Sequence, residues 1–390
     1  NIYKDQLIRE EVLTEDEAKL RISDFKKFLD SEFELSKSYK PNKADWLDGT
    51  WTGFKTASFD ARRGKTSSNE EDIKLIAKEI HSIPDEFTPH KRIKKIYNDR
   101  YQSIVNEKNI DWATAEALAF ASLLADGYGV RLSGQDVGRG TFSHRHAVLY
   151  DQENEERFVP LRHFREKQGL FEIVDSFLSE FGVLGFEYGY SQADPKTLVI
   201  WEAQFGDFSN GAQTIIDQFI TTGERKWLRM SGLTLLLPHG HEGQGPEHTS
   251  SRLERFLQMC AEDNIQVANP TSPANYFHIL RRQMLRDFRK PLILMTPKST
   301  LRHKNNTSSL DQFVNGSTFH RVLSDPIAKE FTNKIDRIIL CSGKIYFELQ
   351  DRINELDLKN IHIVRIEQLY PFPYESLEEE LQEFKNCEII

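Results

Sequence analysis

The chain has 390 residues, which corresponds to two or three domains of about 150 residues each. Its 38% of hydrophobic residues supply enough apolar material for buried cores, and this excludes wholesale disorder. The formal net charge of −9, from 51 basic and 60 acidic residues, gives no general affinity for nucleic acid or anionic membranes.

The cysteines and the ends of the chain narrow the protein class further. Cys260, Cys341 and Cys387 lie far apart without a CxxC pair, so we expect neither disulfides nor a cysteine zinc site, and a reducing compartment is the simplest interpretation. No apolar run approaches the roughly 20 residues of a membrane-spanning helix. The chain opens at Asn1 without a signal-like segment and closes on a strand-like run, residues 387–390. We therefore expect a piece of a longer polypeptide.

Residues 1–105 are the most charged and least strand-like part of the chain. Apolar residues at helical spacing predict a helix over Glu15–Leu29, with Thr14 as its N-cap, and another over Asp72–Ile80. We expect a helical extension that wraps on another part of the protein. The alternative is a poorly packed linker.

From about Ile110, strands and helices alternate. Helices are predicted over Trp112–Leu124, Ala212–Ile220 and Asn275–Phe288. Four almost uniformly apolar runs are predicted strands: Val130–Ser133, Leu198–Trp201, Leu233–Leu237 and Leu292–Met295. Such strands, separated by helices, are typical of a parallel sheet covered on both faces, so we predict an α/β fold.

A second alternation begins near Pro297. Predicted strands occupy Arg337–Cys341, Ile361–Ile366 and Cys387–Ile390, and predicted helices occupy Tyr346–Leu356 and Ser376–Phe384. Ser376 and Glu379 fit a capping box at the start of the last helix. We interpret this region as part of a further α/β domain.

The unusual polar residues follow the predicted strands, where open α/β sheets bind ligands. They lie in four segments: 134–146, 179–182, 202–208 and 239–248. His239, His241 and Glu242 on their own resemble metal ligands, and His144 and His146 would add two imidazoles. However, no HExxH spacing occurs and glycines interrupt the last segment. Loop histidines bonded to backbone and water are the favoured interpretation, and we assign no metal ligand.

Glu180 and two phenylalanines are the other candidates. Glu180 follows the apolar Phe177 and Leu178, and apolar surroundings would suit it to share a proton with a ring nitrogen. The alternative is a helix-capping or ion-paired glutamate. Phe205 and Phe208 could stack on a flat heterocycle, or they could be ordinary core residues. None of these segments decides the function alone.

Four motifs occur together in an order typical of one enzyme family: GQDVGRGTFSHRH (134–146), SEFGVLGFE (179–187), WEAQFGDF (201–208) and GQGPEH (243–248). The chain resembles the thiamine-diphosphate-dependent decarboxylase components of 2-oxoglutarate dehydrogenase. The motifs LERFLQ (253–258) and PKSTLRH (297–303) extend the resemblance, which covers the chain from about Trp46 and is densest from Asp111 to His303.

The resemblance implies a transketolase-like architecture: a helical extension over 1–105, a pyrimidine-binding domain over 106–296 and a truncated C-terminal domain over 297–390. In homodimers of this family, the cofactor lies between the pyrimidine domain of one subunit and the diphosphate domain of the other. The diphosphate domain binds Mg²⁺ through Gly-Asp-Gly followed by Asn, and this sequence contains no Gly-Asp-Gly. The resemblance therefore implies half an active site, which is inactive alone.

The resemblance also implies roles for individual residues. The residues expected to bind the cofactor are Glu180, Gln204, Phe205, Phe208 and Gln135. Glu180 would hydrogen-bond the pyrimidine ring and activate the cofactor, and the two phenylalanines would stack on that ring. His248 would contact the substrate, and His144 and His146 would support the site from further away.

The implied reaction is the oxidative decarboxylation of 2-oxoglutarate in the citric acid cycle, with thiamine diphosphate and magnesium. The succinyl group would pass to the lipoyl arm of dihydrolipoyl succinyltransferase. The expected compartment is the cytoplasm of a bacterium or the mitochondrial matrix of a eukaryote. Two alternatives stay open: a relative acting on another 2-keto acid such as 2-oxoadipate, and a noncatalytic assembly or regulatory subunit.

Overall fold

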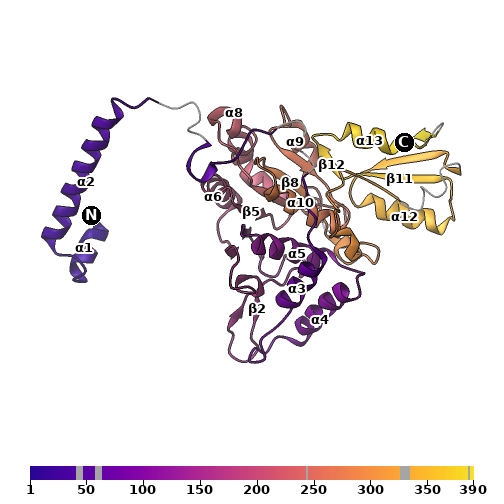
Figure 1. The fold of residues 1–390 in the computed structure, drawn as a ribbon, viewed down its shortest axis with the longest axis horizontal. Helices are drawn as coiled ribbons and strands as arrows, with labels where there is room; N and C mark the ends of the chain where they lie inside the picture. The colour runs from indigo at the N-terminus through magenta and orange to yellow at the C-terminus, as the bar shows by residue number, and fades with distance from the viewer. Residues whose placement is uncertain (41–46, 58–63, 243–244, 326–333, 385–386) are drawn as a thin grey trace. The chain divides into compact units, whose positions relative to one another are not determined.

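The computed structural model describes residues 1–40, 47–57, 64–242, 245–325, 334–384 and 387–390 (Figure 1). The chain divides into two compact units, Asn1–Asp48 and Gly49–Ile390. None of the helices described in these ranges is long and apolar enough to cross a membrane.

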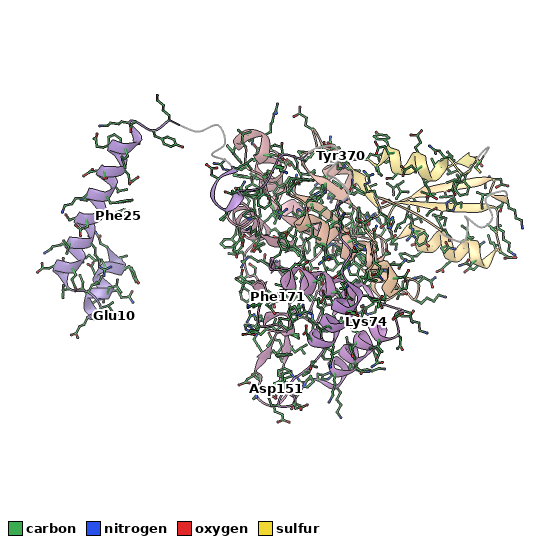
Figure 2. All side chains as sticks on the ribbon, in the orientation of Figure 1. Glu10, Phe25, Lys74, Asp151, Phe171 and Tyr370 are labelled. Carbon is green, nitrogen blue, oxygen red and sulfur yellow. The ribbon has the colours of Figure 1, made fainter. Side chains whose placement is uncertain are left out.

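The smaller unit contains two helices, α1 (Ile2–Arg9) and α2 (Glu15–Ser36). The predicted N-cap is confirmed: the Glu17 amide donates to the Thr14 hydroxyl, and the Thr14 amide donates to the Glu17 carboxylate at 2.8 Å. Among the residues of these two helices, Ala18 alone is buried. Apolar side chains such as Phe25 therefore lie on the surface of this unit (Figure 2).

The larger unit is built on a seven-stranded sheet with the strand order β12-β7-β8-β6-β5-β1-β4. Its strands are β1 (Gly129–Gly134), β4 (Phe171–Asp175), β5 (Thr197–Glu202), β6 (Thr234–Pro238), β7 (Gln266–Ala268), β8 (Leu292–Thr296) and β12 (Gln368–Tyr370). All neighbouring strands are parallel except β12 and β7, which are antiparallel. The predicted parallel sheet is confirmed, although the sequence did not indicate β4, β7 or β12.

The central strands are apolar on both sides because helices cover both faces of this sheet. Along β5, Leu198 and Ile200 join one hydrophobic cluster, while Val199 and Trp201 join the other. This alternation explains why the strand reads as a continuous apolar run.

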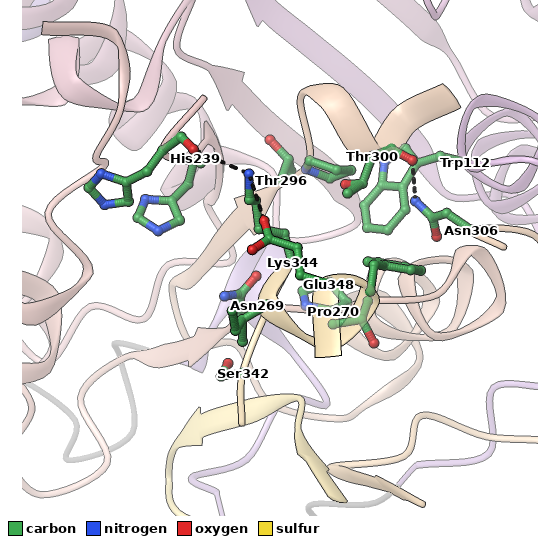
Figure 3. A pocket seen from close by; sticks show the side chains of 17 residues that line it. Trp112, His239, Asn269, Pro270, Thr296, Thr300, Asn306, Ser342, Lys344 and Glu348 are labelled. Atoms are coloured by element: carbon green, nitrogen blue, oxygen red, sulfur yellow. Dashed lines mark hydrogen bonds and ion pairs between the residues drawn. The ribbon is translucent and has the colours of Figure 1, made fainter. Parts of the chain in front are cut away.

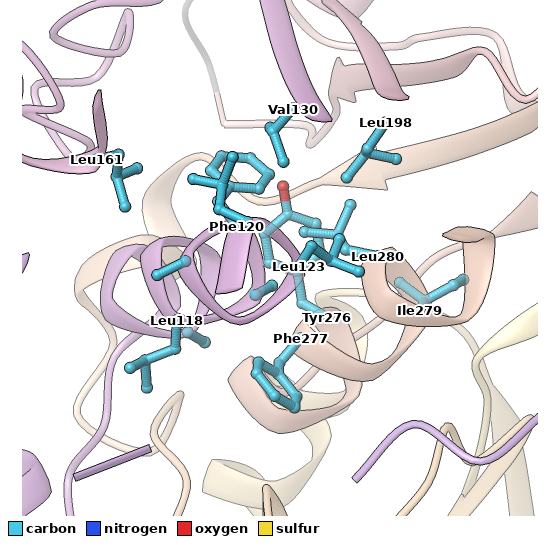
Figure 4. Packing of buried hydrophobic residues seen from close by; sticks show 14 of the residues in the cluster. Leu118, Phe120, Leu123, Val130, Leu161, Leu198, Tyr276, Phe277, Ile279 and Leu280 are labelled. Atoms are coloured by element: carbon cyan, nitrogen blue, oxygen red, sulfur yellow. The ribbon is translucent and has the colours of Figure 1, made fainter. Parts of the chain in front are cut away.

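The first cluster lies against α3 (Glu70–Ile80), α5 (Trp112–Ala125) and α10 (Pro273–Leu285). Figure 4 shows Phe120 of α5 and Tyr276 of α10 in this cluster, together with Val130 and Leu198 of the sheet. Helix α4 (Lys91–Val105) packs beside α3. The predicted helices over 72–80 and 112–124 are therefore confirmed, and both pack into the core of the larger unit.

The second cluster lies against α6 (Glu180–Ala193), α7 (Gln213–Ile215), η6 (Ile216–Ile220) and α9 (Leu253–Gln258). The expected single α-helix over 212–220 is wrong in detail, because its second part, η6, is π-helical.

The remaining short elements are β2 (Leu149–Tyr150), β3 (Arg157–Phe158), α8 (Gly223–Trp227), η2 (Gly49–Trp51), η4 (Pro160–Arg162), η5 (Gly206–Ala212), η7 (Pro246–His248), η8 (Ser299–Arg302) and η9 (Leu310–Gln312).

A four-stranded sheet with the order β13-β10-β11-β9 follows in the C-terminal part. Its elements are β9 (Val322–Ser324), β10 (Arg337–Cys341), α12 (Ile345–Glu355), β11 (Ile361–Ile366), α13 (Tyr374–Leu381) and β13 (Glu388–Ile389). The predicted capping box at Ser376 is wrong, because the last helix begins earlier, at Tyr374. Ser376 is already inside that helix, and its hydroxyl accepts a hydrogen bond from Arg321 at 2.9 Å.

Candidate functional site

Three neighbouring strands of the seven-stranded sheet end at one edge and continue into loops. Gly134 of β1 pairs with Glu202 of β5, and Glu202 pairs with Leu236 of β6, so the strands end nearly level. We call the segments that follow the β1 loop (residues 135–148), the β5 loop (203–212) and the β6 loop (239–250). Open α/β sheets bind ligands at the carboxyl ends of their strands, so this edge is the candidate site.

Three rings from two of these loops form an aromatic cluster: Phe205, Phe208 and His248. The His248 ring lies 4.3 Å from the Phe205 ring and 5.6 Å from the Phe208 ring, measured between centroids. The two phenyl rings are 6.0 Å apart. Gly206 permits this arrangement, because a Cβ atom there would overlap the Ser251 hydroxyl. The structure therefore brings together three of the residues that the sequence analysis named as candidate site residues.

His248 is held mainly through its backbone. The buried Lys298 donates from Nζ to the His248 carbonyl oxygen at 2.5 Å, and its amine lies 5.8 Å from the centre of the Phe205 ring. Burial lowers the pKa of Lys298, and the charges of Glu242 and Asp207 oppose that shift. The His248 imidazole lies 3.3 Å from the Glu247 carboxylate and is otherwise directed to the aromatic cluster.

Glu180 is the first residue of α6. Its carboxylate lies against the β5 loop, where a Cβ atom added to Gly211 would be 3.3 Å from Oε2. No group in the described part of the chain forms a hydrogen bond or ion pair with it, which leaves its oxygens available to a ligand. The expected apolar surroundings are not found: Phe177 is fully exposed, and Leu178 is more than half exposed.

The two glutamines belong to different loops, Gln135 to the β1 loop and Gln204 to the β5 loop. Gln204 donates from Nε2 to the Asp136 carboxylate at 3.2 Å, which joins the two loops. Gln135, half-buried, precedes Asp136, whose φ of 58° lies in the left-handed region. The ring of Phe142, also in the β1 loop, meets the ring of Phe205 edge to face at 5.5 Å.

Comparison with known proteins identifies the domain that carries this edge. Residues 108–304 match the family model "transketolase, pyrimidine binding domain", and residues 307–390 match "2-oxoglutarate dehydrogenase C-terminal". The chain belongs to the transketolase pyrimidine-binding family. It is 53% identical over 399 aligned residues to proteins named 2-oxoglutarate dehydrogenase E1 component from the bacteria Brucella canis, Brucella suis and Brucella anthropi. The match covers 100% of this chain and 40% of each relative, so the chain spans about two fifths of their length.

His144 and His146 lie near the end of the β1 loop of the pyrimidine-binding domain. The His144 ring is 6.4 Å from the ring of Phe142, and burial together with the charges of Arg145 and Arg100 lowers its pKa well below the ordinary value. His146 has a φ of 52°, and its Nε2 bonds to the Ser143 carbonyl at 3.0 Å. Phe142 thus lies between His144 and the aromatic cluster, while no ring contact joins His146 to the cluster among the residues described.

The histidines of the β6 loop do not assemble into a ligand set in the described part of the domain. The rings of His239 and His241 are 5.9 Å apart and nearly perpendicular. The Ser251 amide donates to Nδ1 of His239 at 3.0 Å, which leaves the proton on Nε2. No group of three or more His, Cys, Asp or Glu residues suited to a metal ion occurs among the residues described, while Gly243 and Gln244 lie outside them.

Two functional candidates escaped the sequence analysis. Arg145 lies between Glu116 and Glu202, which are 29 and 57 residues away, so no local pattern could reveal the contact. Asp207 was noted only as part of a motif. It is 4% exposed, and neither carboxylate oxygen has a hydrogen-bond partner in the part of the chain that the structure describes.

A hollow of about 320 Å³ lies beside the site (Figure 3). It is bounded by His239 and His241 of the β6 loop, by Asn269 after β7, and by Ser342 and Lys344 before α12. Lys344 donates from Nζ to the His241 carbonyl at 3.2 Å. The C-terminal domain thus contacts the same loop that carries His248.

Proposed function

We propose that the full-length protein is the thiamine-diphosphate-dependent decarboxylase of a 2-oxoglutarate dehydrogenase complex. This chain supplies the half of the active site that holds the pyrimidine ring of the cofactor. One observation carries the proposal: the β5 loop supplies two of the three rings of the aromatic cluster and also contacts the unpaired carboxylate of Glu180. The names of the relatives and the two matched family models support the substrate assignment.

The residues at this edge fit an aminopyrimidine ring. Phe205 and Phe208 offer apolar faces to a flat heterocycle, and His248 closes the third side of the cluster. The Glu180 carboxylate has free acceptor positions for a ring N–H. The sequence contains no Gly-Asp-Gly, so we propose that magnesium and the diphosphate are held by residues outside this chain and that the chain alone is inactive.

The bound cofactor would supply a nucleophilic thiazolium carbon and an electron sink for decarboxylation. Glu180 would hold and transfer a proton at the pyrimidine ring nitrogen, which is the step that activates the cofactor. His248 would donate a hydrogen bond to the oxygen of the reacting keto group, and Lys298 would hold the His248 backbone in place. Phe205 and Phe208 would exclude water from the ring.

We propose a homodimer, because the half of the active site that holds the pyrimidine ring needs a second half. The aromatic side chains of Phe177, Phe181 and Phe186, on and next to α6, are at least half exposed. Large exposed apolar residues along one helix are typical of a surface that a partner covers. The succinyl group would then pass to the lipoyl arm of dihydrolipoyl succinyltransferase.

Replacing Glu180 by Gln in the full-length protein tests the proposal. Gln preserves the volume and one hydrogen bond but cannot transfer a proton, so decarboxylation with an artificial electron acceptor should fall by about 10²–10⁴-fold. Proton–deuterium exchange at the thiazolium carbon should slow in parallel. A merely capping glutamate would instead cost about 1 kcal/mol of stability and leave turnover unchanged.

A matched control lies on the same helix. Glu187 is buried and paired with Arg131 at 2.8 Å, so Glu187→Gln should lower stability but leave the exchange rate near that of the wild type. Wild-type exchange in Glu180→Gln would remove Glu180 from the proposed role. Measuring 2-oxoadipate beside 2-oxoglutarate tests the substrate separately, since a preference for the longer acid would change the substrate and not the mechanism.

A further inference from the structure

The guanidinium group of Arg145 uses all five of its N–H donors in a buried site. Nε and Nη2 donate to Glu116 at 2.5 and 3.1 Å, and Nη1 and Nη2 donate to Glu202 at 2.6 and 2.8 Å. The fifth bond joins Nη1 to the Val137 carbonyl at 3.1 Å. Only a planar guanidinium can satisfy two carboxylates and a carbonyl together, because a lysine amine has three donors and no fork geometry.

The two carboxylates belong to different parts of the domain. Glu116 lies within α5 and also accepts a hydrogen bond from Tyr276 of α10 at 2.8 Å, so it connects Arg145 to the helical layer. Glu202 is the last residue of β5, immediately before the β5 loop. The ion pair between Arg145 and Glu202 therefore joins the β1 loop to β5. That strand continues directly into the loop that contains Gln204, Phe205 and Phe208.

Two further contacts join the same loops, and both are weaker. One is the hydrogen bond from Gln204 to the half-exposed Asp136, and the other is the edge-to-face contact of Phe142 with Phe205. Exposed polar contacts and single ring contacts are each worth a fraction of a buried, charge-assisted pair. The pair Arg145–Glu202 is thus the strongest of the three side-chain contacts that join the β1 loop to the end of β5 and the loop that follows it.

The far side of Arg145 is also anchored. Arg100 of α4 donates to the carbonyl oxygens of His144 and of Arg145, the latter at 3.0 Å, and the Tyr97 hydroxyl donates to the His146 carbonyl at 2.7 Å. The backbone around Arg145 is therefore fixed before its side chain reaches Glu202. A fixed guanidinium can set the position of a strand end, whereas a mobile one could only follow it.

We infer that Arg145 and Glu202 are positioning residues for the pyrimidine ring: through their buried ion pair they set the distance between the β1 loop and the aromatic cluster. This inference rests on the proposed function for the identity of the ligand. Neither residue needs to touch the cofactor, and their effect reaches it through Gln204, Phe205 and Phe208.

The test compares two buried carboxylates in the full-length protein. Glu202→Gln should increase amide hydrogen exchange in residues 135–146 and 204–208 of the cofactor-free protein, because one charge-assisted connection is lost. The Kd for thiamine diphosphate with magnesium should rise about 10-fold or more. Arg145→Lys, which keeps the charge but not the five bonds, should change both quantities in the same direction and serves if Glu202→Gln does not fold.

Glu367→Gln is the matched control. Glu367 is as buried as Glu202, and its carboxylate accepts hydrogen bonds from the Thr271 amide and from Asn275, each at 2.8 Å, far along the chain from the site loops. The Glu367→Gln variant should lower thermal stability without altering amide hydrogen exchange in residues 135–146 and 204–208 or the Kd for thiamine diphosphate.

The inference is overturned if Glu202→Gln leaves loop exchange and Kd at wild-type values, or if Glu367→Gln changes them equally. If the wild-type full-length protein does not bind thiamine diphosphate, the proposed function is wrong. The exchange comparison, made without cofactor, still decides whether Arg145 and Glu202 position the two loops.

Discussion

The β1 and β6 loops flank the same candidate site, but they are held by different kinds of contact. The β1 loop is fixed from inside by a buried guanidinium with five bonds. The β6 loop is held by separate contacts: Lys344 donates to the His241 carbonyl oxygen, Ser299 donates to the Glu242 carboxylate, and Lys298 donates to the His248 carbonyl oxygen. The comparison indicates that one buried ion network holds the β1 loop, whereas contacts to several neighbouring segments hold the loop that carries His248.

The largest expected effect is a loss of stability in the β1 loop, which depends on Arg145. Arg145→Met leaves Glu116 and Glu202 buried together without a cation, so the free energy of unfolding should fall by about 3–5 kcal/mol. Chemical denaturation of the wild type and the variant measures the loss. Arg139→Met is the control, because Arg139 is in the same loop but is half exposed and forms a single ion pair in the described part of the chain, with Asp136 at 3.5 Å. This variant should lower the free energy of unfolding by less than about 1 kcal/mol. Equal losses in both variants would contradict the comparison.

The next largest effect is a loss of activity caused by a change in the β6 loop. His248→Ala should lower decarboxylation by the full-length protein by about 10²–10³-fold, as the loss of one hydrogen-bond donor to a developing charge does elsewhere. Stability should barely change, because the ring of His248 is only part-buried and the Lys298 bond goes to its backbone. Steady-state kinetics and thermal unfolding separate the two effects, and His163→Ala, an exposed histidine outside the site, should alter neither.

The smallest effect is a difference in acid sensitivity. The pKa of His144 in the β1 loop lies well below the ordinary 6.5, first because of burial, and that of His239 in the β6 loop is also lowered, first by burial. Both side chains are neutral when folded, so stability is present above pH 6.5 and is lost as the pH falls from there toward the folded pKa. The loss should be larger for His144, because its pKa is lowered further.

Asparagine variants measure this loss, since Asn is polar but does not titrate in this pH range. The unfolding free energies of the wild type and H144N should converge below pH 6.5, and those of the wild type and H239N should converge less. Equal convergence, or a larger one for His239, would show that the two loops do not differ in this respect.

The sequence predicted the candidate site better than the contacts that position it. Glu180, Phe205, Phe208 and His248 lie in short motifs after apolar runs, and the structure gathers the last three into one cluster. The partners of Arg145 could not be predicted, because a buried ion pair leaves no periodic signal in the sequence.

The fold shows the same limit. The long apolar strands β5, β6 and β8 were predicted because both of their faces are buried. Strand β7 is three residues long and is indistinguishable from a loop without its neighbours. The surroundings of Glu180 were mispredicted because neighbours in sequence, such as Phe177, point to the surface of this unit.

Strand β12 comes from the region that matches the 2-oxoglutarate dehydrogenase C-terminal model, yet it completes the sheet of the pyrimidine-binding domain. Its antiparallel pairing with β7 covers backbone groups that would otherwise form an open sheet edge. A protein shortened after residue 304 would therefore contain every residue that matches the pyrimidine-binding family model. It would still expose the unpaired edge of β7, which could pair with a strand of another molecule. For protein engineering, the useful point of division lies beyond Tyr370.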